Sequence, residues 1–166
     1  MTEACLNASA AATDIENYPV RLVIPTLSIN TNVQYTTITK RGTMGTPNNF
    51  TDVAWYGYGV APGQSGEAVI DGHVDNGLGL AGVFLHLDNI QTGDDIYVTE
   101  KDGTILHFQV TDITSYDYAN LPMDQIISST GSPRLALITC GGDWISSEHI
   151  YDKRLVITAS LVNTVN

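Results

Sequence analysis

The chain has 166 residues, of which 43% are apolar, and its 18 acidic and 7 basic side chains give a formal net charge of −11. This length suits one domain with a sizeable core and excludes two full-sized domains. The negative charge argues against partners that carry phosphate groups, so neither nucleic acid nor an anionic membrane is an expected partner. Strand-forming residues dominate the apolar set, which predicts a mainly β fold.

The first half of the chain predicts short strands separated by turns. Residues 1–17 are expected to form a flexible leader, and residues 18–166 a single domain. The pattern predicts strands over residues 20–29, 33–38, 53–58 and 67–70. Pro25 interrupts the first of these strands, which places it at an edge or a bulge, and the turn before the second is expected at residues 30–32.

The second half predicts four more strands. Residues 80–87 are expected to form a short helix, and a long connection over 114–133 is expected to hold one helical turn. The predicted strands cover residues 94–100, 104–112, 134–140 and 154–162, the first two forming a hairpin around Asp102-Gly103. Eight short strands with one or two short helices predict a closed barrel or a sandwich.

Three residues at predicted strand borders suggest chemistry: His73, Cys140 and Arg154. Cys140 ends an apolar strand and precedes Gly141-Gly142, a placement that favours a reactive thiol over a structural one. A thiol attacks as the thiolate, and an imidazole can take its proton and later return it to a leaving amine. A guanidinium can stabilise the negative charge that attack creates on a carbonyl oxygen. The three residues could therefore transfer an acyl group from a peptide bond if the fold brings them together.

Each of these residues also has an ordinary structural interpretation. A lone histidine such as His73 is more often a surface or capping residue. His149 is the main rival for the base, because it shares the predicted loop that follows Cys140, whereas His86 and His107 are expected on the surfaces of a helix and a strand. The second cysteine lies in the expected leader, so no disulfide is expected.

Several ordered segments resemble the sortases, a family of bacterial cysteine transpeptidases. Residues 24–29 resemble the family's first-strand IPxLxI motif, and Gly72-His73 resembles the segment of its catalytic histidine. Residues 137–140 match the core of the TLxTC motif, and residues 154–159 resemble the strand that opens with an essential arginine. The resemblance extends from residue 20 to residue 162, with Ala136 where TLxTC has its first threonine.

The resemblance implies an eight-stranded β-barrel in which Cys140 is the nucleophile, His73 the acid and base, and Arg154 the oxyanion or substrate stabiliser. The family cleaves an LPxTG-type sorting motif after its threonine and forms a thioacyl enzyme. An amine such as a peptidoglycan cross-bridge or a pilin lysine then resolves this intermediate. The domain would work at the extracellular face of the cytoplasmic membrane or in the cell wall, with its anchor segment absent from this sequence.

The resemblance also implies which residues contact the sorting motif and which class is closest. The expected substrate-binding residues are Thr139, Gly141, Leu121, Pro122 and Ile126. The local patterns Trp55-Tyr56, Pro62-Gly63 and Val74-Asp75 look most like class F, with class E or D as alternatives. Asp75 either orients His73 or is a solvated turn residue. The carboxylates lack the spacing of a calcium loop, so no metal or other cofactor is expected.

Two other functions stay open on the sequence. The first is a non-catalytic cell-surface barrel that binds a ligand through its acidic surface and the aromatic segment 55–58. The second is a different cysteine hydrolase. Papain-like enzymes place the cysteine before the histidine, and L,D-transpeptidases place a histidine just before the cysteine, so neither order fits. A structure with His149 rather than His73 against Cys140 would favour this second option.

Overall fold

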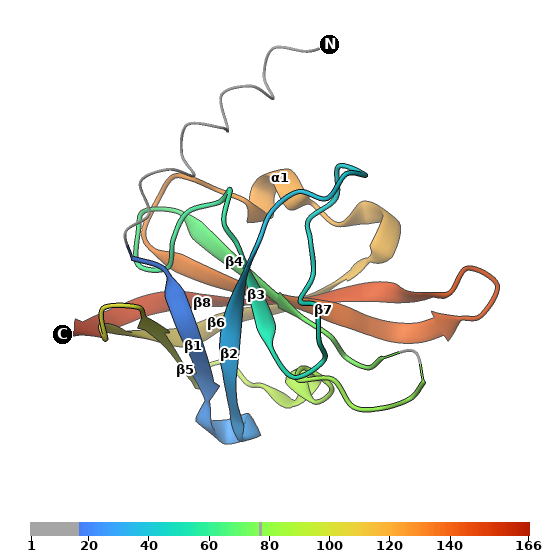
Figure 1. Cartoon of the computed structure of the whole chain (residues 1–166), viewed down its shortest axis with the longest axis horizontal. Coiled ribbons are helices and arrows are strands. Elements are labelled where there is room, and N and C mark those ends of the chain that lie inside the picture. The colour runs from blue at the N-terminus through green and yellow to red at the C-terminus, as the bar shows by residue number, and fades with distance from the viewer. Residues whose placement is uncertain (1–16, 77) are drawn as a thin grey trace, which may run out of the picture.

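A computed structural model describes residues 17–76 and 78–166. Eight strands close into a barrel in the order β1-β2-β3-β4-β7-β8-β6-β5 (Figure 1). The strands are β1 (Pro19–Ile24), β2 (Ile29–Thr36), β3 (Val53–Tyr56), β4 (Glu67–Gly72), β5 (Asp95–Glu100), β6 (Ile105–Asp117), β7 (Arg134–Ile145) and β8 (Ile150–Val165). The described helices are α1 (Met123–Ile126) and the 3-10 turns η2 (Pro25–Leu27), η3 (Leu87–Asn89) and η4 (Tyr118–Asn120). The expected mainly β barrel with few helices is confirmed, whereas the expected leader lies outside the described residues except for Asn17.

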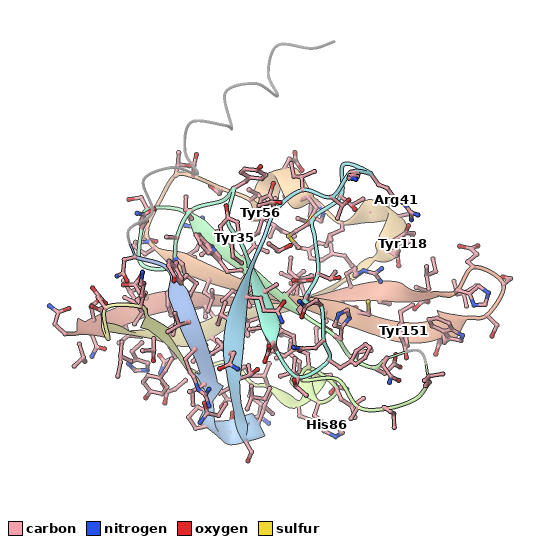
Figure 2. All side chains as sticks on the ribbon, viewed as in Figure 1. Tyr35, Arg41, Tyr56, His86, Tyr118 and Tyr151 are labelled. Atoms are coloured by element: carbon pink, nitrogen blue, oxygen red, sulfur yellow. The ribbon has the colours of Figure 1, made fainter. Side chains whose placement is uncertain are left out.

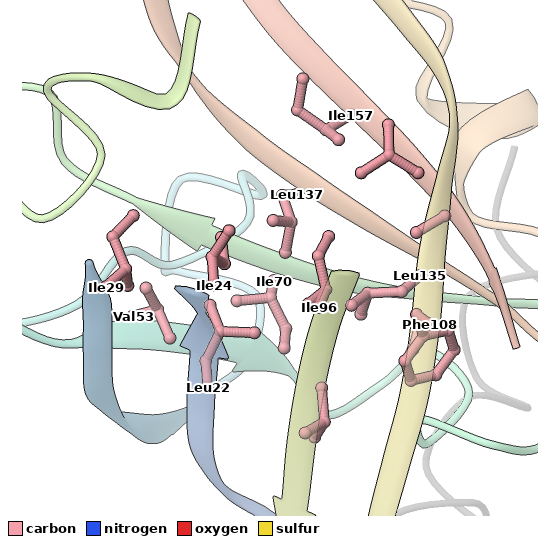
Figure 3. Close-up of a cluster of buried hydrophobic side chains, with 14 of the residues drawn as sticks. Leu22, Ile24, Ile29, Val53, Ile70, Ile96, Phe108, Leu135, Leu137 and Ile157 are labelled. Carbon is pink, nitrogen blue, oxygen red and sulfur yellow. The ribbon is translucent and has the colours of Figure 1, made fainter. Parts of the chain in front are cut away.

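Alternate residues of the strands point to opposite faces and build two apolar clusters. The larger cluster fills the barrel and includes Leu22, Ile70, Phe108, Leu137 and Ile157 (Figure 3). The smaller cluster lies on the outer face of β4, β7 and β8, beneath the connection that holds η4 and α1. This covered outer face is where the cavity described below is found.

The β2–β3 and β4–β7 pairs are parallel, and the other pairs in the barrel are antiparallel. In the β4–β7 pair, the end of β4 that precedes His73 and the part of β7 that carries Cys140 therefore run in the same direction. The last paired residues are Asp71 and Ile138, so the chain just beyond β4 runs beside the residues that follow Ile138.

Two predicted elements were wrong near the start of the barrel and after β4. The first turn is at Pro25–Ser28 rather than at residues 30–32, because Pro25 starts a 3-10 turn that Ser28 closes in the left-handed conformation, with φ of 55°. Residues 80–87 form turns rather than a helix. Gly82 and Phe84 donate their N–H groups to the carbonyls of Val74 and His73, at 2.9 Å each, instead of to a helical neighbour.

β6 and β7 are longer than predicted. β6 continues to Asp117, so the connection before β7 begins there rather than at residue 114. β7 passes through Cys140 and Gly141-Gly142 and ends only at Ile145, which corrects the prediction that the strand ends at the cysteine. The register with β8 shifts between Gly141 and Trp144, and Gly142 has a φ of 75°. Glycine permits this bulge, so the hairpin continues as a projection beyond the barrel (Figure 1).

Candidate active site

A cavity of about 590 Å³ opens on the outer face of the barrel. Its walls come from the β2–β3 loop on one side and from the η4–α1 connection on the other. The side chains that line it include Met44, Tyr56, Asp71, His73, Tyr118, Leu121, Met123, Ile127, Ile138, Thr139, Cys140 and Arg154. Tyr56 and Tyr118 are labelled in Figure 2, where Tyr151 lies on the β7–β8 hairpin. The three residues predicted to act together therefore line one cavity.

Cys140 and Arg154 are cross-strand partners in the β7–β8 pair. Paired residues of neighbouring strands lie about 5 Å apart, which keeps the guanidinium near the thiol. Arg154 Nη1 donates to the carbonyls of Tyr151 and Lys153, at 3.0 and 2.8 Å. Its guanidinium also lies 4.8 Å from the centre of the Tyr118 ring. Among the described residues, no carboxylate lies within ion-pair distance of Arg154, so its charge is available to a ligand in the cavity.

His73 follows β4 directly, and its side chain contacts the β2–β3 loop. Its Nε2 atom lies 3.0 Å from the carbonyl oxygen of Pro47, and its ring lies 5.4 Å from that of Phe50. The buried hydroxyl of Thr139 donates to the carbonyl of Gly72 at 2.7 Å, which ties the end of β4 to β7 beside Cys140. Because a carbonyl can only accept, the proton of a neutral ring is on Nε2, and Nδ1 keeps the lone pair that a base needs.

The charges around Cys140 oppose one another. Burial raises the pKa of its thiol, the Arg154 guanidinium lowers that pKa, and the carboxyl groups of Asp71 and Asp75 raise it. The net effect raises the pKa, so at neutral pH the resting cysteine is a protonated thiol. Thiolate must then form during attack, with a base beside the sulfur to take the proton.

The Arg154 charge gives the first testable prediction. Replacing Arg154 with alanine should raise the pKa of Cys140 further, because a nearby opposite charge favours the thiolate. The pH dependence of alkylation by iodoacetamide measures this pKa. Arg154→Lys is the matched control and should shift the midpoint less, since it keeps a positive charge. An unchanged midpoint in Arg154→Ala would show that the guanidinium does not act on the sulfur.

A smaller opening of about 200 Å³ also borders the thiol. His73, Cys140 and Arg154 line it too, together with Asp75, Trp144, His149 and Tyr151. The Tyr151 hydroxyl donates a hydrogen bond to Asp75 Oδ2, and this bond raises the pKa of Tyr151 to about 12. Half-buried Asp75 therefore has a tyrosine partner that the sequence did not predict, because Tyr151 belongs to the other arm of the hairpin.

The two rival histidines have different positions. His73 lines both openings, whereas His149 lines only the smaller one. The His149 ring contacts the Trp144 ring at 6.2 Å, and its backbone has a φ of 55° at the tip of the β7–β8 hairpin. The geometry therefore gives His73 the better position for the base.

The predicted substrate-binding residues have different positions as well. Thr139 and Leu121 line the large cavity, whereas Gly141, Pro122 and Ile126 are not part of its lining. Ile126 is buried in the apolar cluster beneath the connection. Sequence reasoning missed the aromatic and methionine side chains of the cavity wall, because loops far apart in the chain supply them.

Asp71 is the least expected side chain in the cavity wall. It is 8% exposed, although strand positions on a covered face are usually apolar. The sequence signal that could have identified Asp71 was an acidic residue at the end of the apolar run Ala68–Ile70.

Among the described residues, no three histidine, cysteine or acidic side chains are grouped so that they could hold a metal ion. No described helix is long and apolar enough to cross a membrane.

Fold and site together define a β-barrel protein with a cysteine, a histidine and an arginine around one cavity on its outer face. A family model described as the sortase domain matches residues 22–162. The chain therefore belongs to the sortase family.

Several solved structures that resemble the chain are sortases. Sortase A from Corynebacterium diphtheriae is 19% identical, with a TM-score of 0.68, and the match covers 88% of this chain and 61% of that one. Sortase C-1 from Actinomyces oris is 22% identical, with a TM-score of 0.69 and coverage of 98% and 83%. Sortase A from Listeria monocytogenes is 22% identical, with a TM-score of 0.64 and coverage of 89% and 88%. No curated protein sequence matches the chain significantly.

Proposed function

We propose that this protein is a cysteine transpeptidase that cleaves an LPxTG-type sorting motif after its threonine and joins the new carboxyl end to an amine. The observation that carries the proposal is that Cys140, His73 and Arg154 line one cavity large enough for a peptide segment. Family membership supports the same reaction type.

In the proposed reaction, the sulfur of Cys140 attacks the carbonyl carbon of the motif's threonine while His73 takes the thiol proton. Arg154 stabilises the negative oxygen of the tetrahedral intermediate. The carbon–nitrogen bond then breaks, and the imidazolium returns the proton to the leaving amine of glycine. An incoming amine attacks the thioester and gives its proton to His73, and the thiolate of Cys140 leaves. The imidazolium then returns this proton to the thiolate, which regenerates the thiol and the neutral base.

The two openings suggest a division between the two substrates. The large cavity has a wall rich in apolar side chains, such as Tyr56, Met123 and Ile127, and this wall suits the leucine–proline part of the motif. The small opening is more polar, with Asp75 and Tyr151 in its wall, and it suits the amine. Because Cys140 lines both openings, the scissile bond would lie between them.

The finer assignments follow the same proposal. The donors would be LPxTG-type signals of surface proteins, and the acceptor a peptidoglycan cross-bridge or a pilin lysine. The protein would work at the extracellular face of the cytoplasmic membrane or in the cell wall. The local patterns around residues 55, 62 and 74 favour class F, with class E or D as alternatives.

Mass spectrometry of the intact protein tests the function. The protein is incubated with a panel of sorting-motif peptides, first alone and then with triglycine or a lysine-containing peptide as the amine. We expect an adduct of the acyl fragment on Cys140, which disappears when the amine is added and yields the joined peptide. A non-catalytic barrel would show no adduct with any peptide and a Cys140 of ordinary thiol reactivity, and that outcome would refute the proposal.

A further inference from the structure

Asp71 places a buried carboxyl group in the wall of the large cavity. The residue is 8% exposed, and Oδ1 is buried without a hydrogen-bond partner among the described residues. It lines the cavity together with Cys140 and His73. A buried polar atom without a partner is uncommon and needs an explanation, because desolvation without a hydrogen bond is costly.

The surroundings of Asp71 offer few interactions that would offset the free-energy cost of burying its carboxyl group. Its neighbours across the sheet are Ala54 on β3 and Ile138 on β7, both apolar and buried. No described basic side chain forms an ion pair with it. Burial raises the pKa of Asp71 to about 8, so the group is mainly a neutral carboxylic acid at pH 7. In this form it can both donate and accept a hydrogen bond.

The position of Asp71 relative to the thiol is set by the sheet. Asp71 pairs with Ile138, and Cys140 lies two residues further along β7 on the same face. Neighbouring strands are about 4.8 Å apart, and two residues along a strand span about 6.6 Å. Between the carboxyl group and the sulfur there is thus room for about one side chain. A peptide whose carbonyl carbon is attacked by Cys140 must place the side chain of that same residue close to the sulfur.

We propose that Asp71 is a specificity-determining residue whose carboxyl group hydrogen-bonds the side-chain hydroxyl of the substrate residue that supplies the scissile carbonyl. The inference rests on the proposed function, because it requires that the large cavity holds the acyl donor. The hydroxyl would bond to the part of the carboxyl group that faces the cavity and would add to the few interactions of this group, whose Oδ1 has no described hydrogen-bond partner.

The charge in the cavity favours a hydroxyl over a basic side chain as the partner. Arg154 lines the same cavity, and none of the described carboxylates pairs with it. The side chain of a substrate lysine or arginine would meet this positive charge. His73, if protonated, would add to the repulsion. A neutral hydroxyl avoids it and still pairs with Asp71, which makes threonine or serine the expected class of residue at the scissile bond.

The test compares two peptides that differ only at this residue, LPxTG and LPxVG. Threonine and valine have nearly the same shape, so their difference measures the hydroxyl contact. We expect kcat/KM for thioacyl formation to favour threonine by about 100-fold or more, since a site built to bind a hydroxyl rejects the analogue that lacks it. In Asp71→Ala this ratio should fall below about tenfold, mainly through slower acylation by the threonine peptide. Asp71→Asn, which keeps a hydrogen-bonding group, should retain an intermediate ratio.

Glu67 provides the matched control. It is also a buried acid on β4, but it lies near Arg134, at 4.0 Å between Oε2 and Nε, and does not line the cavity. Glu67→Gln should keep the full preference for threonine. Thermal melts identify any variant that fails to fold, and Asp71→Asn then supplies the measurement in place of Asp71→Ala.

The outcomes separate this proposal from the proposed function. If the natural sequence forms a thioacyl adduct with LPxTG but both Asp71 variants keep its threonine-to-valine ratio, the assignment of Asp71 is wrong and the function stands. If the Asp71 variants slowed thioacyl formation equally with the threonine and the valine peptide, the assignment would also be overturned, because equal slowing would indicate a structural role for Asp71. If no adduct forms with any peptide, both proposals fail together.

Discussion

Replacement of Cys140 with alanine is expected to abolish both the thioacyl adduct and peptide transfer. The sulfur forms the bond that holds the acyl fragment, and alanine has no side-chain atom that can form this bond. We expect transfer of an LPxTG-type peptide to fall by at least about 1,000-fold, to the level without enzyme. Liquid chromatography of the joined peptide measures transfer, and mass spectrometry of the intact protein measures the adduct.

The chain carries its own control for this experiment. Cys5 is the other cysteine, and Cys5→Ala should keep full activity and still form the adduct. If Cys140→Ala retained transfer, the cysteine would not be the nucleophile and the proposed reaction would be wrong. An adduct that disappeared only in Cys5→Ala would likewise place the chemistry elsewhere in the chain.

The second large effect is expected at His73. Replacing His73 with alanine should reduce transfer by about 100-fold to 10,000-fold, the usual contribution of a general acid and base. The loss should be large because the resting Cys140 is a protonated thiol and His73, which lines the same cavity, would have to take its proton. Rates of acylation and of amine attack, measured separately, should both fall, since His73 transfers a proton in each step.

His149 is the matched control, because it lines only the smaller of the two openings that Cys140 borders. His149→Ala should change the rate of acylation by less than about threefold, as expected for a residue outside the proton transfer. The reverse pattern, with a severe loss in His149→Ala and a mild one in His73→Ala, would assign the base to the hairpin and reopen the interpretation as another cysteine hydrolase.

The electrostatics of the site favour the protonated thiol of Cys140 in the free protein. Arg154 lowers the pKa of Cys140, but burial and the carboxyl groups of Asp71 and Asp75 outweigh it. A protonated thiol is a poor target for oxidation and alkylation, since the thiolate is the reactive form.

Local chemistry explains which elements could be predicted. The hairpin around Asp102-Gly103 was found because its turn requires residues that tolerate a positive φ, and Gly103 has a φ of 91°. The strand that carries Cys140 was found from its apolar run. The expected helix over residues 80–87 was wrong because N–H groups there donate to the carbonyls of His73 and Val74. A side chain at Gly82 would also lie 2.2 Å from the His73 carbonyl oxygen. Contacts of this kind leave no periodic pattern in the sequence.

The sequence by itself predicted a mainly β domain, either a barrel or a sandwich, and its resemblance to sortases implied the barrel. It also predicted the residue types of the candidate site: a cysteine, a histidine and an arginine, each next to an apolar run that had to become a buried strand. Only the tertiary structure decided that these three side chains line one cavity, that a second opening also borders the thiol, and that the carboxyl group of Asp71 is buried there without a described partner at Oδ1. The physical reason is strand register. Gly72 and Thr139 are 67 residues apart in the chain and meet only because β4 and β7 pair in parallel, so burial and proximity at the site depend on a pairing that no local pattern encodes.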